Sequence, residues 1–240
     1  MGFPTPKPDR RFTVLFFDLD DTLLDTNGQL VAPAAREACA AMIGAGLDAD
    51  LEPCLRERQR LAAERPREDI HLLLARQFGI RPDSGATFQS VRNVGYRAYF
   101  FREILPGITT FPGVYDLLDY LGRRYRLHLV TSGGPPTQRK KVAFLGLEPY
   151  FHGVHYVDTL AGEKKGSVFA ELMHSEAAFP GQCFCVGDRV DREIREGKKL
   201  GMVTCHVHHG EFAGITPQTP EEMADYRIEH ISALVPTCKL

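Results

Sequence analysis

The feature that most constrains this chain is a short apolar run that ends abruptly in acids. Residues 14–17 read VLFF, and Asp18, Asp20 and Asp21 follow at once within DLDDT. A run that is apolar on both faces predicts a buried strand of a parallel sheet, and ligands of such sheets bind beyond the carboxyl ends of the strands. Acids packed this densely repel each other unless a cation or a shared proton relieves the repulsion. We therefore expect a carboxylate nucleophile beside a hard metal ion.

The overall composition argues against several classes of protein. The chain has 240 residues, 43% of them hydrophobic, and a formal net charge of −2, so nothing favours nucleic acid or an anionic membrane as a partner. No apolar run reaches the roughly 18 residues of a membrane span, and residues 1–11 lack the apolar core of a signal peptide. The cysteines are scattered without a CxxC pair, which indicates reduced thiols. We expect a cytoplasmic protein.

Residues 27–108 show helical spacing of their apolar side chains throughout. Helices are predicted near residues 32–44, 55–64, 68–78 and 87–104. No convincing strand pattern occurs between them. We expect a core formed by residues 1–26 and 109–240, interrupted by an all-helical domain of residues 27–108.

From residue 111 onward, strands and helices alternate. After a helix that follows Pro112, strands are predicted at residues 127–130, 153–157, 183–186 and 202–207, with short helices between them. Thr219, Pro220 and Glu222 carry the signals of a helix start, so a short C-terminal helix is expected there. The alternation predicts an α/β fold, with a Rossmann-like parallel sheet between two helical layers and right-handed crossovers.

Polar clusters follow three of the predicted strands. Because parallel strands bring like ends together, we expect these clusters to meet at one edge of the sheet. A pair of lysines precedes the helix that lies between the second and third clusters. The residues are Asp18 and Asp20, Thr131 and Ser132, Lys164 and Lys165, and Asp188 and Asp191.

These clusters resemble the motifs of a known family. The segments DLDDT, VTSG, a lysine ahead of a helix, and VGDRVD look like the four motifs of the haloacid dehalogenase superfamily, in the family's order. The match covers residues 12–26 and 109–207. The helical insert is similar to the family's cap, which lies between the first two motifs, and the second aspartate is typical of the phosphatase branch.

The resemblance implies a phosphatase that works through an aspartyl phosphate. Asp18 would be the nucleophile, and Asp20 would protonate the leaving oxygen and then deprotonate water. Mg²⁺ would be held by Asp18, by the backbone carbonyl of Asp20 and by Asp188. Magnesium and a lysine would offset the repulsion between a phosphate anion and the attacking carboxylate.

The other motif residues would hold the phosphoryl group. Thr131 would donate a hydrogen bond to it, and the backbone N–H of Ser132 could add another. The motif lysine is either Lys164 or Lys165, and the spacing to Phe169 favours Lys165. Asp191 would orient ligands or water from the outer shell.

The remaining residues of the first motif and the histidines receive lesser roles. Asp21 is expected to be a bystander of the turn after the first strand, and Thr22 is expected to brace this turn by hydrogen bonding. His206, His208 and His209 have no companion cysteine pair, so a zinc site is not expected there.

Several alternatives can be weighed from the residues. A calcium loop fails, because Leu23 stands where it needs glycine and Gln29 where it needs glutamate. A phosphonatase needs a cap lysine, and residues 27–108 contain none. A sugar-phosphate mutase or phosphotransferase, and a catalytically idle phosphate-binding regulator, stay open. The expected partner is a small phosphorylated metabolite, for which a cap arginine could hold a second anionic group, and the oligomeric state is open.

Overall fold

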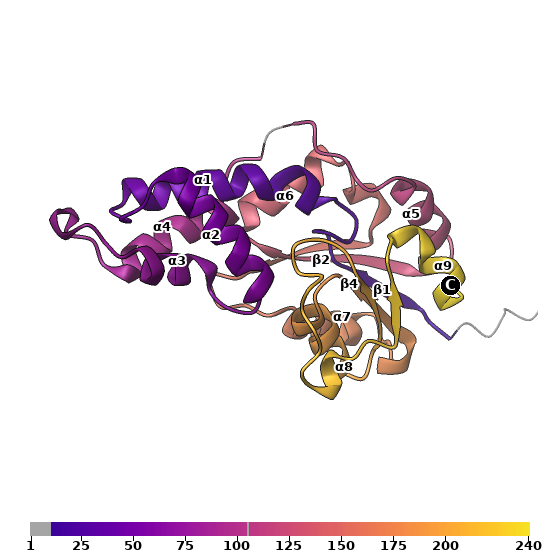
Figure 1. Ribbon diagram of the computed structural model, residues 1–240. Coiled ribbons are helices and arrows are strands. Elements are labelled where there is room, and N and C mark those ends of the chain that lie inside the picture. The colour runs from indigo at the N-terminus through magenta and orange to yellow at the C-terminus, as the bar shows by residue number, and fades with distance from the viewer. Residues whose placement is uncertain (1–10, 105) are drawn as a thin grey trace, which may run out of the picture.

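A parallel sheet forms the centre of the protein (Figure 1). The computed structural model describes residues 11–104 and 106–240. Within them the strand order is β3-β2-β1-β4-β5-β6, and every neighbouring pair is parallel. The strands are β1 (Val14–Phe17), β2 (Arg126–Gly133), β3 (Gly153–Asp158), β4 (Cys183–Gly187), β5 (Val203–Val207) and β6 (Tyr226–Ile228).

Strand β1 lies in the middle of the sheet and is buried on both faces, which explains its unbroken apolar run. Leu15 and Phe17 face the cluster that includes side chains of three helices, α5 (Val114–Gly122), α6 (Pro135–Phe144) and α9 (Leu234–Cys238). Val14 and Phe16 face the opposite cluster, against α7 (Lys165–Ser175). The short α8 (Arg195–Lys199) lies near α7 (Figure 1). The expected three-layer α/β/α fold is confirmed.

Four helices between β1 and α5 form a separate bundle that lies off one end of the sheet (Figure 1). They are α1 (Ala32–Gly44), α2 (Leu51–Glu64), α3 (Ile70–Phe78) and α4 (Phe88–Phe100). Their contacts enclose an apolar core of their own, which includes Met42, Leu74 and Val91. Between residues 27 and 108 the described chain adds no strand to the sheet. The domain limits 26/27 and 108/109 stay a prediction.

The C-terminal part differs from the sequence prediction. Residues Pro220–Glu222 form a 3₁₀ helix with Thr219 as its N-cap, so a helical turn begins where it is expected but does not continue as an α-helix. The Asp225 carboxylate accepts from the N–H of Thr204 at 2.8 Å, which holds the following residues beside β5. Strand β6 forms there as a sixth strand, and its three residues are too few to show an alternating pattern.

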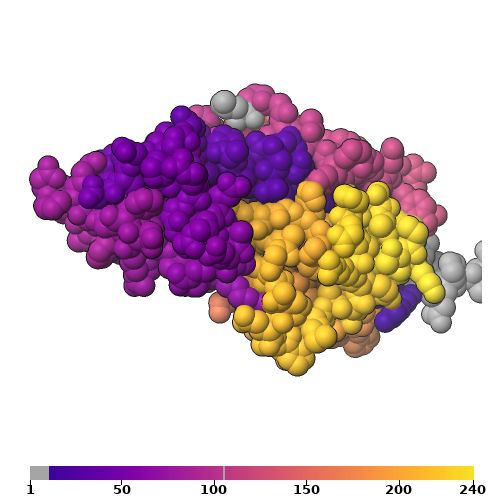
Figure 2. Space-filling view, in the orientation of Figure 1, coloured from indigo at the N-terminus to yellow at the C-terminus, as the bar shows by residue number. Residues whose placement is uncertain are grey.

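The loop after β5 joins the core to the helical bundle. Figure 2 shows this orange to yellow segment against the purple bundle. Glu211 of the loop pairs with Arg58 of α2 at 2.7 Å and accepts from the hydroxyl of Tyr99 of α4 at 2.7 Å. Glu222 pairs with Arg67 at 2.6 Å. The Arg58 pair is buried, and removing one partner of a buried pair is strongly destabilising.

All six cysteines are free thiols with buried side chains. Among the helices of the described residues, none is both long and apolar enough to span a membrane.

Gly210 of this loop has a backbone conformation and surroundings that disfavour a side chain. Its φ is +87°, and an added Cβ would lie 2.1 Å from Oδ2 of Asp21. We expect Gly210→Ala to lower the free energy of unfolding by roughly 1–3 kcal/mol, because of backbone strain and this collision. Urea unfolding measures the loss.

Gly214 of the same loop provides the matched control. It has no left-handed φ, and an added Cβ would meet no atom within 4 Å. Gly214→Ala should leave the urea midpoint unchanged. Equal stability of the two variants would contradict the strained geometry assigned to Gly210.

Candidate active site

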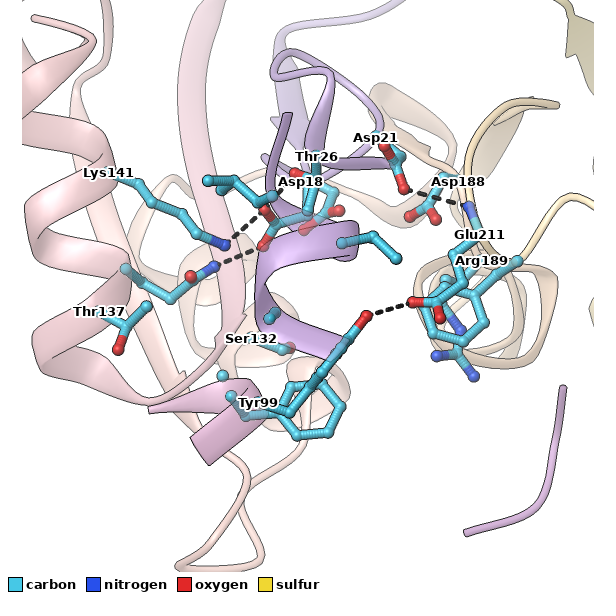
Figure 3. A pocket seen from close by; sticks show the side chains of 18 of the residues that line it. Asp18, Asp21, Thr26, Tyr99, Ser132, Thr137, Lys141, Asp188, Arg189 and Glu211 are labelled. Atoms are coloured by element: carbon cyan, nitrogen blue, oxygen red, sulfur yellow. Dashed lines mark hydrogen bonds and ion pairs between the residues drawn. The ribbon is translucent and has the colours of Figure 1, made fainter. Parts of the chain in front are cut away.

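The carboxyl ends of β1, β2 and β4 bring three of the sequence clusters together. Asp18 follows β1 directly, and its backbone N–H donates to Val186 of β4 at 2.9 Å. Asp18, Ser132 and Asp188 line one cavity of about 110 Å³ between the sheet and the helical bundle (Figure 3). Thr131 is fully buried just beneath it. Like ends of parallel strands meet at one edge of the sheet. This explains why Asp18 lies close to Thr131 and Asp188, which follow it by 113 and 170 positions in the sequence.

Asp18 forms a buried ion pair with Lys165. Lys165 begins α7, and its Nζ donates to Oδ1 of Asp18 and lies 2.5 Å from Oε1 of Glu193. Burial raises the pKa of Asp18 to about 7, although Lys165 opposes this shift, and repulsion from Glu193 and Asp20 adds to it. Lys164 is exposed, so Lys165 is the lysine that reaches the first motif.

Glu193 was not recognised from the sequence. The segment Val190–Ile194 forms a π-helical turn, so side chains do not follow α-helical spacing, and Glu193 is buried beside Lys165. Asp191 pairs through both oxygens, at 3.0 and 2.8 Å, with Arg189, which lines the cavity. The expected outer-shell role of Asp191, orienting ligands or water, stays a prediction. In the sequence, the only signal for a role of Glu193 in the site is that residue 193 is acidic.

Three buried carboxylates form a set that fits a hard divalent cation. Ligand oxygens of Asp18, Asp188 and Glu193 all lie within 4.8 Å of one another. Oε2 of Glu193 is buried and has no hydrogen-bond partner. Burial raises the pKa of Asp188 well above its usual value, and repulsion from Glu193 and Asp18 raises it further. Carboxylate oxygens are the ligands that Mg²⁺ and Ca²⁺ prefer, and a cation would offset this repulsion.

His206 supports this set from β5. Its Nε2 lies 2.9 Å from the carbonyl oxygen of Asp188, which can only accept, so Nε2 carries the hydrogen. Burial lowers the pKa of His206 to about 4, so the ring is neutral at pH 7. His206 thus helps to hold the Asp188 backbone in place. His208 pairs with Glu229 and His209 lies 3.7 Å from Asp25, so the three histidines have separate partners.

Asp20 is held by three residues that lie outside the four predicted motifs. Its Oδ1 accepts from the Thr26 hydroxyl at 2.5 Å and from Nζ of Lys141 at 2.7 Å, and its Oδ2 accepts from Nε2 of Gln138 at 2.8 Å. Burial alone would raise the pKa of Asp20, but Lys141 and these hydrogen bonds outweigh it and lower the pKa. Figure 3 shows Lys141 reaching from α6 into the cavity.

Two expectations for the first motif are wrong. Asp21 is no bystander, because its carboxylate accepts from the N–H groups of Asn27 at 2.7 Å and Glu211 at 3.4 Å. Asp21 has a left-handed φ of 52°, and its two hydrogen bonds link the turn after β1 to the start of the π-helical segment Asn27–Val31 and to the loop after β5. Thr22 was expected to brace the turn by hydrogen bonding, but its Oγ1 is buried without a partner.

The helical bundle supplies the opposite wall of the cavity. Leu30 and Val31, which come just before α1, and Phe100 of α4 give this wall an apolar surface. Tyr99 reaches across to Glu211 of the core loop (Figure 3). Arg102 also lines the cavity, with its guanidinium paired to Glu37 at 2.6 Å.

Comparison with known proteins agrees with this geometry. The family model for haloacid dehalogenase-like hydrolases matches residues 12–201. The chain belongs to this family. This match and the relatives described next confirm the expected enzyme class, a phosphoric monoester hydrolase.

Several relatives that match most of the chain are named as phosphatases. The chain is 32% identical to the glyceraldehyde 3-phosphate phosphatase of Methanopyrus kandleri, covering 90% of this chain and 92% of that protein. It is 27% identical to the pyrimidine 5'-nucleotidase PynA of Streptococcus pneumoniae, covering 83% of this chain and 86% of the relative.

Solved structures share the fold. The putative HAD-hydrolase YfnB from Bacillus subtilis, bound to magnesium, is 21% identical with a TM-score of 0.62, covering 94% of this chain and 98% of that one. A predicted phosphoglycolate phosphatase from Haemophilus somnus is 18% identical with a TM-score of 0.65, covering 94% and 97%. The Rossmann-like parallel fold of this family is thereby confirmed.

Replacing Lys165 should show how much free energy of folding it costs to bury the carboxylates of Asp18 and Glu193. We expect Lys165→Met to lower the free energy of unfolding of the metal-free protein by about 3–5 kcal/mol, since Asp18 and Glu193 lose their counter-charge. The loss of stability should grow from pH 6 to pH 8. Without Lys165 the folded-state pKa of Asp18 is raised further than in the parent protein, and an acid with a raised folded-state pKa destabilises the fold as pH rises.

Lys164→Met is the control, because Lys164 is the adjacent residue and is exposed. Its denaturant midpoint should match that of the parent protein at both pH values. A loss below about 1 kcal/mol for Lys165→Met would mean that the buried ion pair does not contribute as described.

Proposed function

We propose that this protein is a Mg²⁺-dependent phosphatase that hydrolyses a small phosphate monoester through an aspartyl phosphate on Asp18. The observation that supports it most is the contact of Lys165 with Asp18 beside Glu193 and Asp188, at the end of the central strand. A buried carboxylate with an adjacent cation, facing a cavity, is suited to attack an anionic phosphoryl group.

The protein's own residues divide the reaction between them. Asp18 attacks phosphorus, and Asp20 gives its proton to the ester oxygen as the bond between phosphorus and that oxygen breaks. Asp20 then takes a proton from the water that attacks the aspartyl phosphate, which releases phosphate and restores Asp18. Lys165, the Thr131 hydroxyl and the Ser132 N–H hold the phosphoryl oxygens.

Asp18, the backbone carbonyl of Asp20 and Asp188 would hold the magnesium ion, with Glu193 beside them. When bound, the ion supplies positive charge that reduces the repulsion between the phosphate and Asp18. The donor set fits this ion, because it consists of oxygen atoms and leaves Oε2 of Glu193 without another partner.

The substrate is a small phosphorylated metabolite, and residues 27–108 act as a cap that encloses it. A cavity of about 110 Å³ with an apolar cap wall supports a compact ester. The similarity to glyceraldehyde 3-phosphate phosphatases favours a three-carbon phosphate. Closure by the cap would exclude water during transfer to Asp18.

Two other functions of the same site are tested by product analysis. A sugar-phosphate mutase or phosphotransferase would form a phosphorylated organic product without stoichiometric free phosphate. An idle phosphate-binding regulator would bind phosphate without turnover. The intact acid–base candidate Asp20 favours hydrolysis over both.

The direct test is hydrolysis of p-nitrophenyl phosphate. The protein should release p-nitrophenol and one phosphate per turnover with Mg²⁺, and excess EDTA should abolish the release. We expect Asp18→Asn to lower kcat by at least about 10³-fold, because removing a nucleophile leaves little besides binding.

Asp83→Asn serves as the matched control. Asp83 is exposed on a 3₁₀ turn of the helical bundle, away from the cavity. This variant should keep full activity. No turnover by the parent protein, or full turnover by Asp18→Asn, would contradict the proposed hydrolase.

The similarity to known phosphatases predicts a preference among natural esters. The value of kcat/KM for glyceraldehyde 3-phosphate should exceed that for pyrimidine nucleoside 5'-monophosphates by at least about 10-fold, since the chain is more similar to the glyceraldehyde 3-phosphate phosphatase than to the nucleotidase. Phosphate release assays on both substrates measure the ratio. A preference for nucleotides would show that the cap opens to a larger site.

A further inference from the structure

Helix α6 presents buried polar side chains to the active-site cavity, among them Gln138 and Lys141. Gln138 and Lys141 lie three residues apart, so they share a face of the helix. Gln138 is 2% exposed and Lys141 is 7% exposed, which is unusual for such polar residues. Burial of a lysine is costly unless an opposite charge compensates it. The compensating charge here is Asp20, at 2.7 Å.

The two oxygens of Asp20 are not equivalent. Oδ1 accepts two hydrogen bonds, from Lys141 and Thr26, and is therefore saturated. Oδ2 accepts only one, from Gln138, among the described residues. Oδ2 thus keeps a lone pair that can carry a proton. Asp20 is anchored through one oxygen and available through the other.

Gln138 also connects Asp20 to the phosphate side of the cavity. Its Nε2 lies 2.8 Å from Oδ2 of Asp20 and 2.5 Å from Oγ1 of Thr131. The Thr131 hydroxyl, whose lone pair takes this hydrogen bond, keeps its own hydrogen for another acceptor. One face of α6 therefore sets the positions of two side chains of the proposed reaction.

The first motif thus has a separate lysine for each of its two aspartates. Lys165 from α7 contacts Asp18, and Lys141 from α6 contacts Asp20. Separate cations on opposite sides keep the two carboxylates from competing for one counter-charge, and they fix each side chain in one direction. Asp18 is held for attack, and Asp20 is held for proton transfer.

We propose that Lys141, with Gln138, is a positioning residue that anchors Oδ1 of Asp20 so that Oδ2 passes the proton to and from the ester oxygen. The inference rests on the proposed phosphatase function. Because Asp20 pairs with Lys141 as a carboxylate, Oδ2 first takes up a proton from solvent, and in the first step this proton moves to the ester oxygen as its bond to phosphorus breaks. In the second step Oδ2 takes a proton from the attacking water. Lys141 keeps all of its protons throughout.

Leaving-group dependence tests this role. Phenyl phosphate needs protonation of its leaving oxygen, whereas p-nitrophenolate departs without it. The value of kcat/KM reports only steps up to phosphorylation of Asp18. We expect Lys141→Met to lower kcat/KM for phenyl phosphate by about 10²-fold, the lower end of general acid catalysis, and for p-nitrophenyl phosphate by less than about 3-fold.

Three further variants and the inhibition constant of phosphate serve as controls. Lys141→Arg should keep most of the activity on phenyl phosphate that Lys141→Met loses, because an arginine can also donate to Oδ1 of Asp20. Lys140→Met is the control, since Lys140 is the next residue but pairs with Glu103 near the surface at 2.8 Å, and it should behave as wild type. Lys141→Gln replaces the methionine variant if that variant does not fold, with the same selective loss expected. The inhibition constant of inorganic phosphate should stay within about 3-fold, because positioning of a proton donor changes the transition state more than binding.

The outcomes separate the inference from the function on which it rests. For Lys141→Met, an equal change of kcat/KM for both esters would overturn the role of Lys141 and leave the phosphatase function intact. A large rise in the inhibition constant of phosphate would do the same. A wild-type protein that hydrolyses neither ester would overturn the phosphatase function and this inference with it.

Discussion

The site depends on one buried cation between two carboxylates. Lys165 begins α7 and contacts both Asp18 and Glu193, which the fold has removed from water. Neither carboxylate can be buried in ionised form at this point without it or a metal ion, because an uncompensated buried charge is strongly destabilising. The position of α7 on the sheet is therefore also a condition for the nucleophile. The packing of Phe169 under β1 holds that helix.

A second cation gives Asp20 a different environment from Asp18. Burial raises the pKa of Asp18 to about 7, whereas Lys141 and three hydrogen bonds lower the pKa of Asp20 despite its burial. Two aspartates separated by one residue thus receive opposite shifts. A cation bound by Asp18 would lower the pKa of Asp18 and favour the ionised form that a nucleophile needs, and Asp20 must take up a proton before it can act as the general acid.

The sheet and the strand-end residues could be predicted because they rest on local signals. The VLFF run requires burial on both faces, and parallel strands must bring Asp18, Thr131 and Asp188 to one edge. Glu193 could not be predicted, since a π-helical turn moves it out of α-helical register. Lys141, Gln138 and His206 were missed because their roles arise only from tertiary contacts with Asp20 and Asp188. Strand β6 was missed because its pairing with β5 depends on Asp225 and not on its own pattern.

The central claim is that Asp18 carries the phosphoryl group. The most direct measurement is mass spectrometry of acid-quenched Asp20→Asn protein after mixing with p-nitrophenyl phosphate and Mg²⁺. Loss of the base slows hydrolysis of the intermediate, so the phosphoryl group should accumulate on the peptide that contains Asp18. Turnover with the phosphoryl group on another residue, or with no phosphorylated peptide at any time, would contradict the account.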